Sequence, residues 1–271
     1  MLAALLMSAG LSFGVSRTTL PVRARTTSNW SGLEVSSLVA QPESVAMSTR
    51  LPPFPAAVGN AISSSVQESV WVGVGGDFAF GSKVGDWLPQ AGWTIAPFGR
   101  KWTIEPWAAV WHQSNDQAQF PGWFGKWLLV PVGSRLQARI SRERGVWYVR
   151  LVVATRSRTT TFVRKLPILP GEPRSYPVAE AILETPTLGS FSANLSPVPD
   201  PIFYTDLAPS APFTLTATVR YGDSAAPSVH ELSLVRHDDG PKAQTRVMTA
   251  YETGAAVNAQ ARITLDSSVG R

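Results

Sequence analysis

Residues 135–154 read RLQARISRERGVWYVRLVVA, two alternating runs separated by one turn. In the first run, apolar side chains occupy every second position and polar ones stand between them, which is typical of a half-buried strand. Arg144-Gly145 predicts the turn, because glycine accepts the backbone conformation that tight turns need. In the second run, one face carries only Trp147, Val149, Leu151 and Val153. The segment therefore predicts two antiparallel strands with one face in a core.

The same strand pattern recurs along the rest of the chain. Residues 213–221 alternate apolar side chains with threonine and arginine. Residues 70–74 and 127–130 are continuously apolar, as are strands that are covered on both faces. The 22 prolines and 21 glycines separate these short runs. Many short strands divided by turn residues favour an all-β fold, an antiparallel β-sandwich.

The composition excludes several kinds of catalytic site. Of the 271 residues, 44% are hydrophobic and 16% are charged, which is typical of a packed globular protein. The absence of cysteine excludes disulfides, thiolate nucleophiles and cysteine-based zinc sites. His112, His230 and His237 lack a metal-ligand spacing, and no Gly-x-Ser-x-Gly elbow or phosphate loop is present. A hydrolase built on this chain would therefore work without a thiol, a metal or a recognisable Ser-His pair.

The charge pattern bears on partners and location. The net charge is +5, and residues 135–165 are rich in arginine. Arg135 and Arg139 alternate with apolar residues, which predicts a solvent-facing surface rather than a nucleic-acid site. No run is long enough for a membrane span. Residues 1–15 are small and apolar like the core of a signal peptide, so we expect a secreted protein.

Four short motifs place amide and carboxylate side chains in or beside apolar strands. They are NWSG (29–32), WVGVGGD (71–77), DWLPQAG (86–92) and YPVAEAILETP (176–186). The third contains Gln90, and the fourth contains Glu180 and Glu184. These two glutamates are an even number of positions apart and would face the same side of a strand.

In this order, from about Asn29 to about Leu207, the motifs resemble those of the glutamic peptidases (eqolisins, peptidase family G1). The resemblance implies a lectin-like jelly roll of two curved sheets and a catalytic dyad of Gln90 and Glu180. A carboxylate can take a proton from water and return it to the leaving amine. An amide can donate a hydrogen bond to the developing oxyanion. The resemblance thus implies a cofactor-free acid endopeptidase acting on a protein or peptide.

Details of the resemblance concern the residues around this dyad. The family's glutamine lies in a Leu-x-Gln-x-Gly turn, which Leu88, Gln90 and Gly92 match. Ala181 stands where the family has Trp, and Gln113 stands where it has Glu. These two departures favour an alternative function, a non-catalytic lectin-like sandwich that binds a peptide or carbohydrate polymer in an aromatic-lined groove. The side chains expected to bind substrate are Trp30, Trp107, Trp111, Gln113 and Glu184.

The expected organisation has three parts. Residues 1–28 are expected to form a leader or tail, and residues 29–207 a glutamic-peptidase-like sandwich. Residues 208–271 still alternate as strands and are expected to extend that sandwich. We expect the protein to be a monomer.

Overall fold

The computed structural model describes most of the chain as β-strands. The described residues are 17–18, 20–27, 30–37, 41–53, 68–75, 87–98, 101–114, 117–119, 122–171, 176, 178–184, 213–221, 227–236, 240–252 and 256–265. The regular structure among these residues consists of strands and turns, and includes no helix. Accordingly, no helix that could span a membrane is found in this part of the chain.

The strands are β1 (Arg17–Thr18), β2 (Val22–Thr27), β3 (Trp30–Ser36), β4 (Pro42–Arg50), β5 (Glu68–Val74), β6 (Trp87–Phe98), β7 (Lys101–Ser114), β8 (Gln117–Gln119), β9 (Gly122–Phe124), β10 (Leu128–Val130), β11 (Arg135–Glu143), β12 (Val146–Ala154), β13 (Thr159–Lys165), β14 (Val178–Glu184), β15 (Phe213–Tyr221), β16 (Ser228–Arg236), β17 (Gly240–Glu252) and β18 (Ala256–Leu265).

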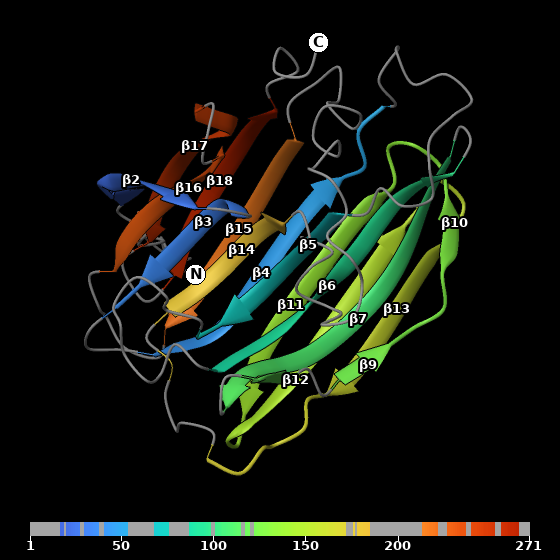
Figure 1. Ribbon diagram of the computed structural model, residues 1–271, viewed down its shortest axis with the longest axis horizontal. Coiled ribbons are helices and arrows are strands. Elements are labelled where there is room, and N and C mark those ends of the chain that lie inside the picture. The colour runs from blue at the N-terminus through green and yellow to red at the C-terminus, as the bar shows by residue number, and fades with distance from the viewer. Residues whose placement is uncertain are drawn as a thin grey trace, which may run out of the picture.

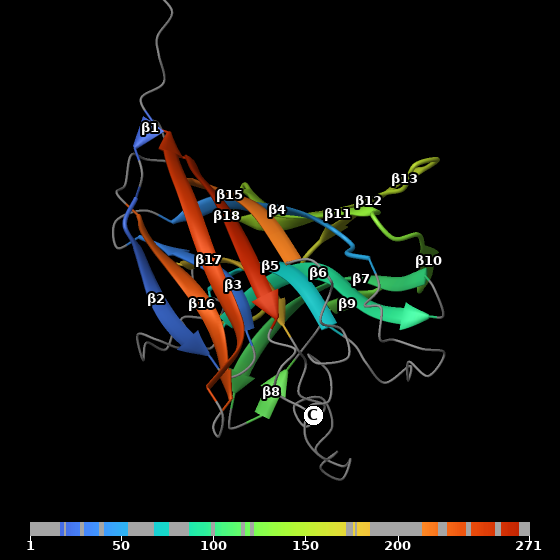
Figure 2. The same cartoon turned by 90° about the horizontal axis from the view of Figure 1, so that it is seen from above.

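These strands form two mostly antiparallel sheets that pack against each other (Figure 1). Sheet A has the order β2–β16–β3–β14–β5–β6–β7, with β8, β9 and β10 paired along β7. Sheet B has the order β1–β17–β18–β15–β4–β11–β12–β13. Figure 2 shows β4, β11, β12 and β13 in one layer and β5, β6, β7 and β9 in the other. The predicted all-β antiparallel sandwich is confirmed.

The core lies between the two sheets, and the alternation seen in the sequence decides which side chains enter it. On β11, Leu136, Ala138 and Ile140 are buried while Arg135 and Arg139 are exposed. β12 and β15 follow the same rule, with every second residue buried. The arginine-rich segment therefore has its apolar side chains in the core and its cations toward solvent, as predicted.

One strand differs from its prediction. Residues 127–130 were expected to be covered on both faces, yet Trp127 is 43% and Leu129 51% exposed. The reason is position: among the described strands β10 pairs only with β7, through Leu128–Val130. In β10, exposed Leu129 stands between half-buried Leu128 and buried Val130, so only one face of the strand is covered and this interpretation was wrong.

The last four strands are built into both sheets. β15 lies between β4 and β18 in sheet B. β16 lies between β3 and β2 in sheet A, where its pairing with β2 is parallel. β16 also pairs with β17 and so joins the two sheets. β1 and β2 come from the segment expected as a leader, so described structure begins before Asn29.

Candidate active site

Sheet A carries a second apolar cluster on the face that points away from sheet B, which we call the outer face. Along β14, Ala179, Ala181 and Leu183 belong to the core between the sheets. Ile182 belongs to the outer cluster, so Glu180 and Glu184 also lie on the outer face. The buried members of the outer cluster are Trp71, Leu88, Trp107, Ile182 and Leu232.

The strand register puts Gln90 and Glu180 in one row of this face, on either side of β5. Gly73 of β5 is paired with Glu180 of β14 on one side and with Gln90 of β6 on the other. Directly paired residues share a face, so all three lie on the outer face. Neighbouring strands are about 4.8 Å apart, which places the two Cα atoms about 10 Å apart. Gly73 has no side chain of its own in this row, and the ends of the Leu88 and Trp71 side chains lie next to it.

Gly73 is the small residue that this arrangement needs. A Cβ at Gly73 would lie 2.8 Å from Leu88 Cδ1 and 2.9 Å from Trp71 Cζ3. The apolar side chains of the outer cluster therefore already occupy the space next to the glycine. Any larger residue would require the Leu88 and Trp71 side chains to move.

Gln90 reaches this position from within a strand, not from a turn. The segment from Leu88 to Gly92 was expected to be a turn by resemblance, but it lies inside β6. All of it is paired with β7, and residues 90–92 are also paired with β5. Alternation explains this, because Leu88 is in the outer cluster while Ala91 and Trp93 are in the core. The expected turn was wrong.

Both dyad candidates are buried. Glu180 is 0% and Gln90 5% exposed. A buried carboxylate depends on its polar surroundings to offset the loss of hydration. The polar surroundings of this row therefore matter as much as the two residues themselves.

Glu184 is held by an aromatic side chain from the neighbouring strand. Trp71 Nε1 donates a hydrogen bond of 2.8 Å to Glu184 Oε2. Ile182 stands between Glu184 and Glu180 along the outer face of β14. Glu184 is thus two same-face pairs away from the row of Gln90, and its carboxylate already has an indole donor.

A buried charged group continues the row on the other side of Glu180. Glu34 of β3 is paired with Glu180, and His230 of β16 is paired with Glu34. Arg25 Nη1 donates a hydrogen bond of 3.1 Å to Glu34 Oε1. His230 Nδ1 lies 3.2 Å from the same oxygen, although the contact lacks hydrogen-bond geometry. The row therefore runs His230, Glu34, Glu180, Gly73, Gln90.

Sequence reasoning missed Glu34 and His230. One feature of the sequence could have indicated Glu34. It lies two positions after Gly32 of the NWSG motif and therefore shares a strand face with it. His230 carried no such signal, since its place depends on the pairing of β16 with β3, two strands that are far apart in the sequence.

The expected substrate-binding residues are only partly gathered here. Trp107 is buried in the outer cluster, and Trp111 is half-buried against it. Backbone pairing sets Trp30 opposite Glu184, and Gln113 opposite Ala118. The side chains of Trp30 and Gln113 lie outside the described part of the chain.

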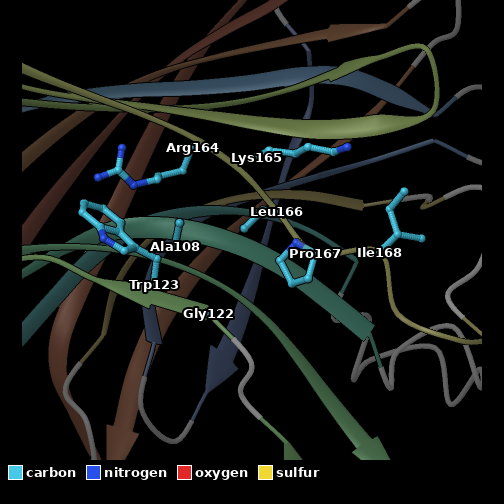
Figure 3. A pocket seen from close by; sticks show the side chains of 8 residues that line it. All are labelled: Ala108, Gly122, Trp123, Arg164, Lys165, Leu166, Pro167 and Ile168. Carbon is cyan, nitrogen blue, oxygen red and sulfur yellow. The ribbon is translucent and has the colours of Figure 1, made fainter.

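A pocket of about 680 Å³ opens on the other side of sheet A (Figure 3). Its lining residues are Ala108, Gly122, Trp123, Arg164, Lys165, Leu166, Pro167 and Ile168. Arg164 lies over the ring of Trp123, 4.1 Å from its centroid. Ala108 faces the core side of β7, whereas Ala109 is paired with Gln90 on the outer face. This pocket is therefore separate from the row of Gln90 and Glu180.

Within the described residues, no group of three or more His, Asp or Glu side chains is placed to hold a metal ion. In comparisons with known proteins, no family model matches the chain and no curated protein matches it.

Proposed function

We propose that this chain is an exported glutamic-type endopeptidase that hydrolyses peptide bonds of proteins or peptides, with Glu180 and Gln90 as its dyad. The observation that carries the proposal is the row in which Gly73 is paired with both residues on one face. The ordered motifs from NWSG to YPVAEAILETP support it independently, because they single out the same two residues.

The chemistry follows from the two functional groups. The ionised Glu180 carboxylate takes a proton from a water molecule, whose oxygen attacks the scissile carbonyl carbon. The Gln90 side-chain N–H donates a hydrogen bond to the oxyanion that forms. One donor of this kind lowers the barrier by about 3–4 kcal/mol. Glu180 then gives its proton to the leaving amine, the C–N bond breaks, and the carboxylate is regenerated.

Burial adds a requirement to this mechanism. Because Glu180 is 0% exposed, a peptide reaches its carboxylate only after the outer face opens. The assay therefore compares untreated protein with protein that has been preincubated in acid at a moderate temperature.

The test compares three variants on an unfolded protein substrate between pH 2.5 and pH 8. Glu180→Gln and Gln90→Ala are expected to lower kcat by two orders of magnitude or more, since each removes a group that acts in the transition state. Glu43→Gln, which changes an exposed carboxylate of β4, serves as the matched control and keeps wild-type rates. Glu180→Gln with wild-type turnover would overturn the proposal.

A fourth variant tests which carboxylate is the base. Glu184→Gln is expected to retain turnover, because the Glu184 carboxylate is engaged by Trp71 and lies outside the row of Gln90. Loss of turnover in Glu184→Gln together with activity in Glu180→Gln would reverse the two assignments.

A second function is favoured by one observation, the gathering of Trp71, Trp107 and Trp111 on the outer face beside a buried polar row. Trp71 and Trp107 are buried, so this function, like hydrolysis at Glu180, requires the outer face to open. The opened face would suit a non-catalytic lectin-like sandwich that binds an extended peptide or carbohydrate polymer against indole rings. Binding of a polymer by folded wild-type protein that hydrolyses no substrate at any pH, before or after acid preincubation, would select this second function.

A further inference from the structure

β13 forms one edge of sheet B, and apolar side chains are exposed along it. The strand is paired with β12, and no other described strand is paired with it. Val163 on β13 is 57% exposed, and Ile168 in the segment that follows is 64% exposed. An unpaired strand edge presents N–H and C=O groups to which another extended chain can bind. This edge is therefore a candidate docking surface for a polypeptide.

The hydrogen bonds with β12 show which backbone groups of β13 point to the open edge. Thr155 N donates to Arg158 O just before β13, and Leu166 N donates to Trp147 O just after it. Backbone groups in an antiparallel pair alternate in direction, so the even-numbered residues of β13 point theirs toward β12. The odd-numbered residues point theirs to the open edge, and they are Thr159, Thr161, Val163 and Lys165.

A side-chain contact agrees with this assignment. Arg164 Nη1 donates a hydrogen bond of 2.7 Å to Val163 O. This carbonyl thus accepts from a side chain, as expected where no neighbouring strand offers an N–H. The same guanidinium lies over the ring of Trp123, at the wall of the pocket described above. Arg164 therefore stands between the open edge and the pocket, and an arriving backbone N–H would take its place at Val163 O.

The charges of the pocket and the edge are all of one sign. The pocket lining contains Arg164 and Lys165 and no carboxylate, and β13 itself has no acidic residue. Neighbouring residues of a strand point to opposite faces. Figure 3 accordingly shows the Arg164 and Lys165 side chains extending in opposite directions. A single small anion does not meet both cations, whereas an extended segment with acidic side chains on both of its faces does.

We propose that the open edge of β13, with the pocket beside it, binds an extended acidic segment of a partner polypeptide as an added strand. Two consecutive acidic side chains of that strand point to opposite faces, one toward Arg164 and one toward Lys165. Its apolar neighbours cover Val163 and Ile168. A second copy of this chain fits poorly, because cations on both edges would repel. The inference does not depend on the proposed peptidase function.

The first experiment compares an acidic probe with a neutral one. The acidic probe is a dye-labelled peptide of sequence Thr-Val-Glu-Glu-Val-Thr, and the neutral probe has Gln at both Glu positions. Fluorescence anisotropy at neutral pH and low salt measures the binding of each. Wild type and Glu180→Gln are expected to bind the acidic probe equally and the neutral probe several-fold more weakly. Equal affinity for the two probes, or no saturable binding of the acidic one, overturns the inference.

Charge variants test the two cations. Arg164→Gln and Lys165→Gln are each expected to weaken binding of the acidic probe about two- to fivefold, the range that exposed ion pairs give. Arg262→Gln is the matched control, since Arg262 is exposed on β18 and the change in net charge is the same. An equal loss in the control shows that net charge attracts the probe, and this result overturns the inference.

Backbone variants test strand addition. Val163→Pro removes an N–H at the open edge and leaves the hydrogen bonds with β12 in place. It is expected to abolish binding, whereas Val163→Thr, which keeps the N–H, is expected to retain it. Binding by folded Val163→Pro with wild-type affinity overturns the inference. Self-association of wild type that Val163→Pro abolishes also overturns it, because a second copy would then occupy the edge.

Hydrogen exchange in the wild-type protein decides the matter if Val163→Pro does not fold. The acidic probe is expected to slow exchange of the amides of Thr161, Val163 and Lys165, which point to the open edge. The amides of Phe162 and Arg164 already point toward β12 and are expected to stay unchanged. Slowing at both sets of amides, or at neither, counts against an added strand and overturns the inference.

Discussion

At the scale of single residues, the site depends on where side chains are missing. Gly73 and Gly92 both face the outer cluster of sheet A, Gly73 within the row of Gln90 and Glu180 and Gly92 in the next same-face pair. At Gly73 an added Cβ would meet the ends of the Leu88 and Trp71 side chains. At Gly92 it would meet the Val70 carbonyl oxygen and the Trp71 Cα, which are backbone atoms.

These contacts predict a ranking of two variants. Gly73→Ala is expected to lower the free energy of unfolding by about 1–3 kcal/mol, the usual cost of overpacking that side chains can partly relieve. Gly92→Ala is expected to cost more, because backbone cannot move aside as side chains do. Urea unfolding monitored by tryptophan fluorescence measures both. Equal costs would mean that the backbone around Gly92 is softer than its pairing indicates.

His230 predicts how stability responds to acid. Its pKa is lowered, first by burial and then by Arg25 and Arg23. The unfolded chain therefore takes up a proton below about pH 6.5 while the folded chain does not, so this residue makes stability fall as pH falls through that value. His230→Asn is expected to lose less unfolding free energy than wild type between pH 7 and pH 5. Parallel stability curves would contradict the assignment.

At the scale of elements, the exposed face of sheet B sets like charges against one another. Arg139 of β11 is paired with Arg150 of β12, and both are exposed. Like charges in directly opposite positions destabilise a sheet, by an amount that salt reduces. The repulsion between these two arginines therefore destabilises sheet B slightly at low salt.

Arg139→Glu is expected to stabilise the protein by roughly 0.2–1 kcal/mol at low salt, because it converts a repulsive pair into an attractive one. The gain shrinks as salt is added. Thermal or urea unfolding at two salt concentrations measures it. Arg158→Glu, in the turn after β12, is the control, and a gain of the same size there would indicate a general charge effect instead of a cross-strand one.

At the scale of the whole molecule, the composition predicts the inhibitor profile of the proposed activity. The chain has no cysteine, and the described residues hold no cluster of metal ligands. Hydrolysis is therefore expected to be unaffected by thiol reagents, chelators and serine-directed inhibitors, and to decline toward neutral pH. Incubation with each reagent before the assay measures this. Abolition of hydrolysis by EDTA would refute the mechanism through Glu180 and Gln90.

Much of the fold was predictable because strand patterns are local. Alternation in residues 135–154 and 213–221 identified both the strands and their buried faces. Local patterns were misleading in two places. Residues 127–130 are apolar, yet Trp127 and Leu129 are exposed, because only one face of β10 is covered. Residues 88–92 resemble a turn yet lie within β6.

The sequence by itself determined that Gln90, Glu180 and Glu184 lie in or beside apolar strands, and that the two glutamates share a face. It could do so because the direction of a side chain depends only on its position within its own strand. The tertiary structure alone decided that Gly73 separates Gln90 from Glu180, that Glu34 is the neighbour of Glu180, and that His230 joins them. These facts depend on which strands pair and in which register, and pairing is set by the packing of segments far apart in the chain.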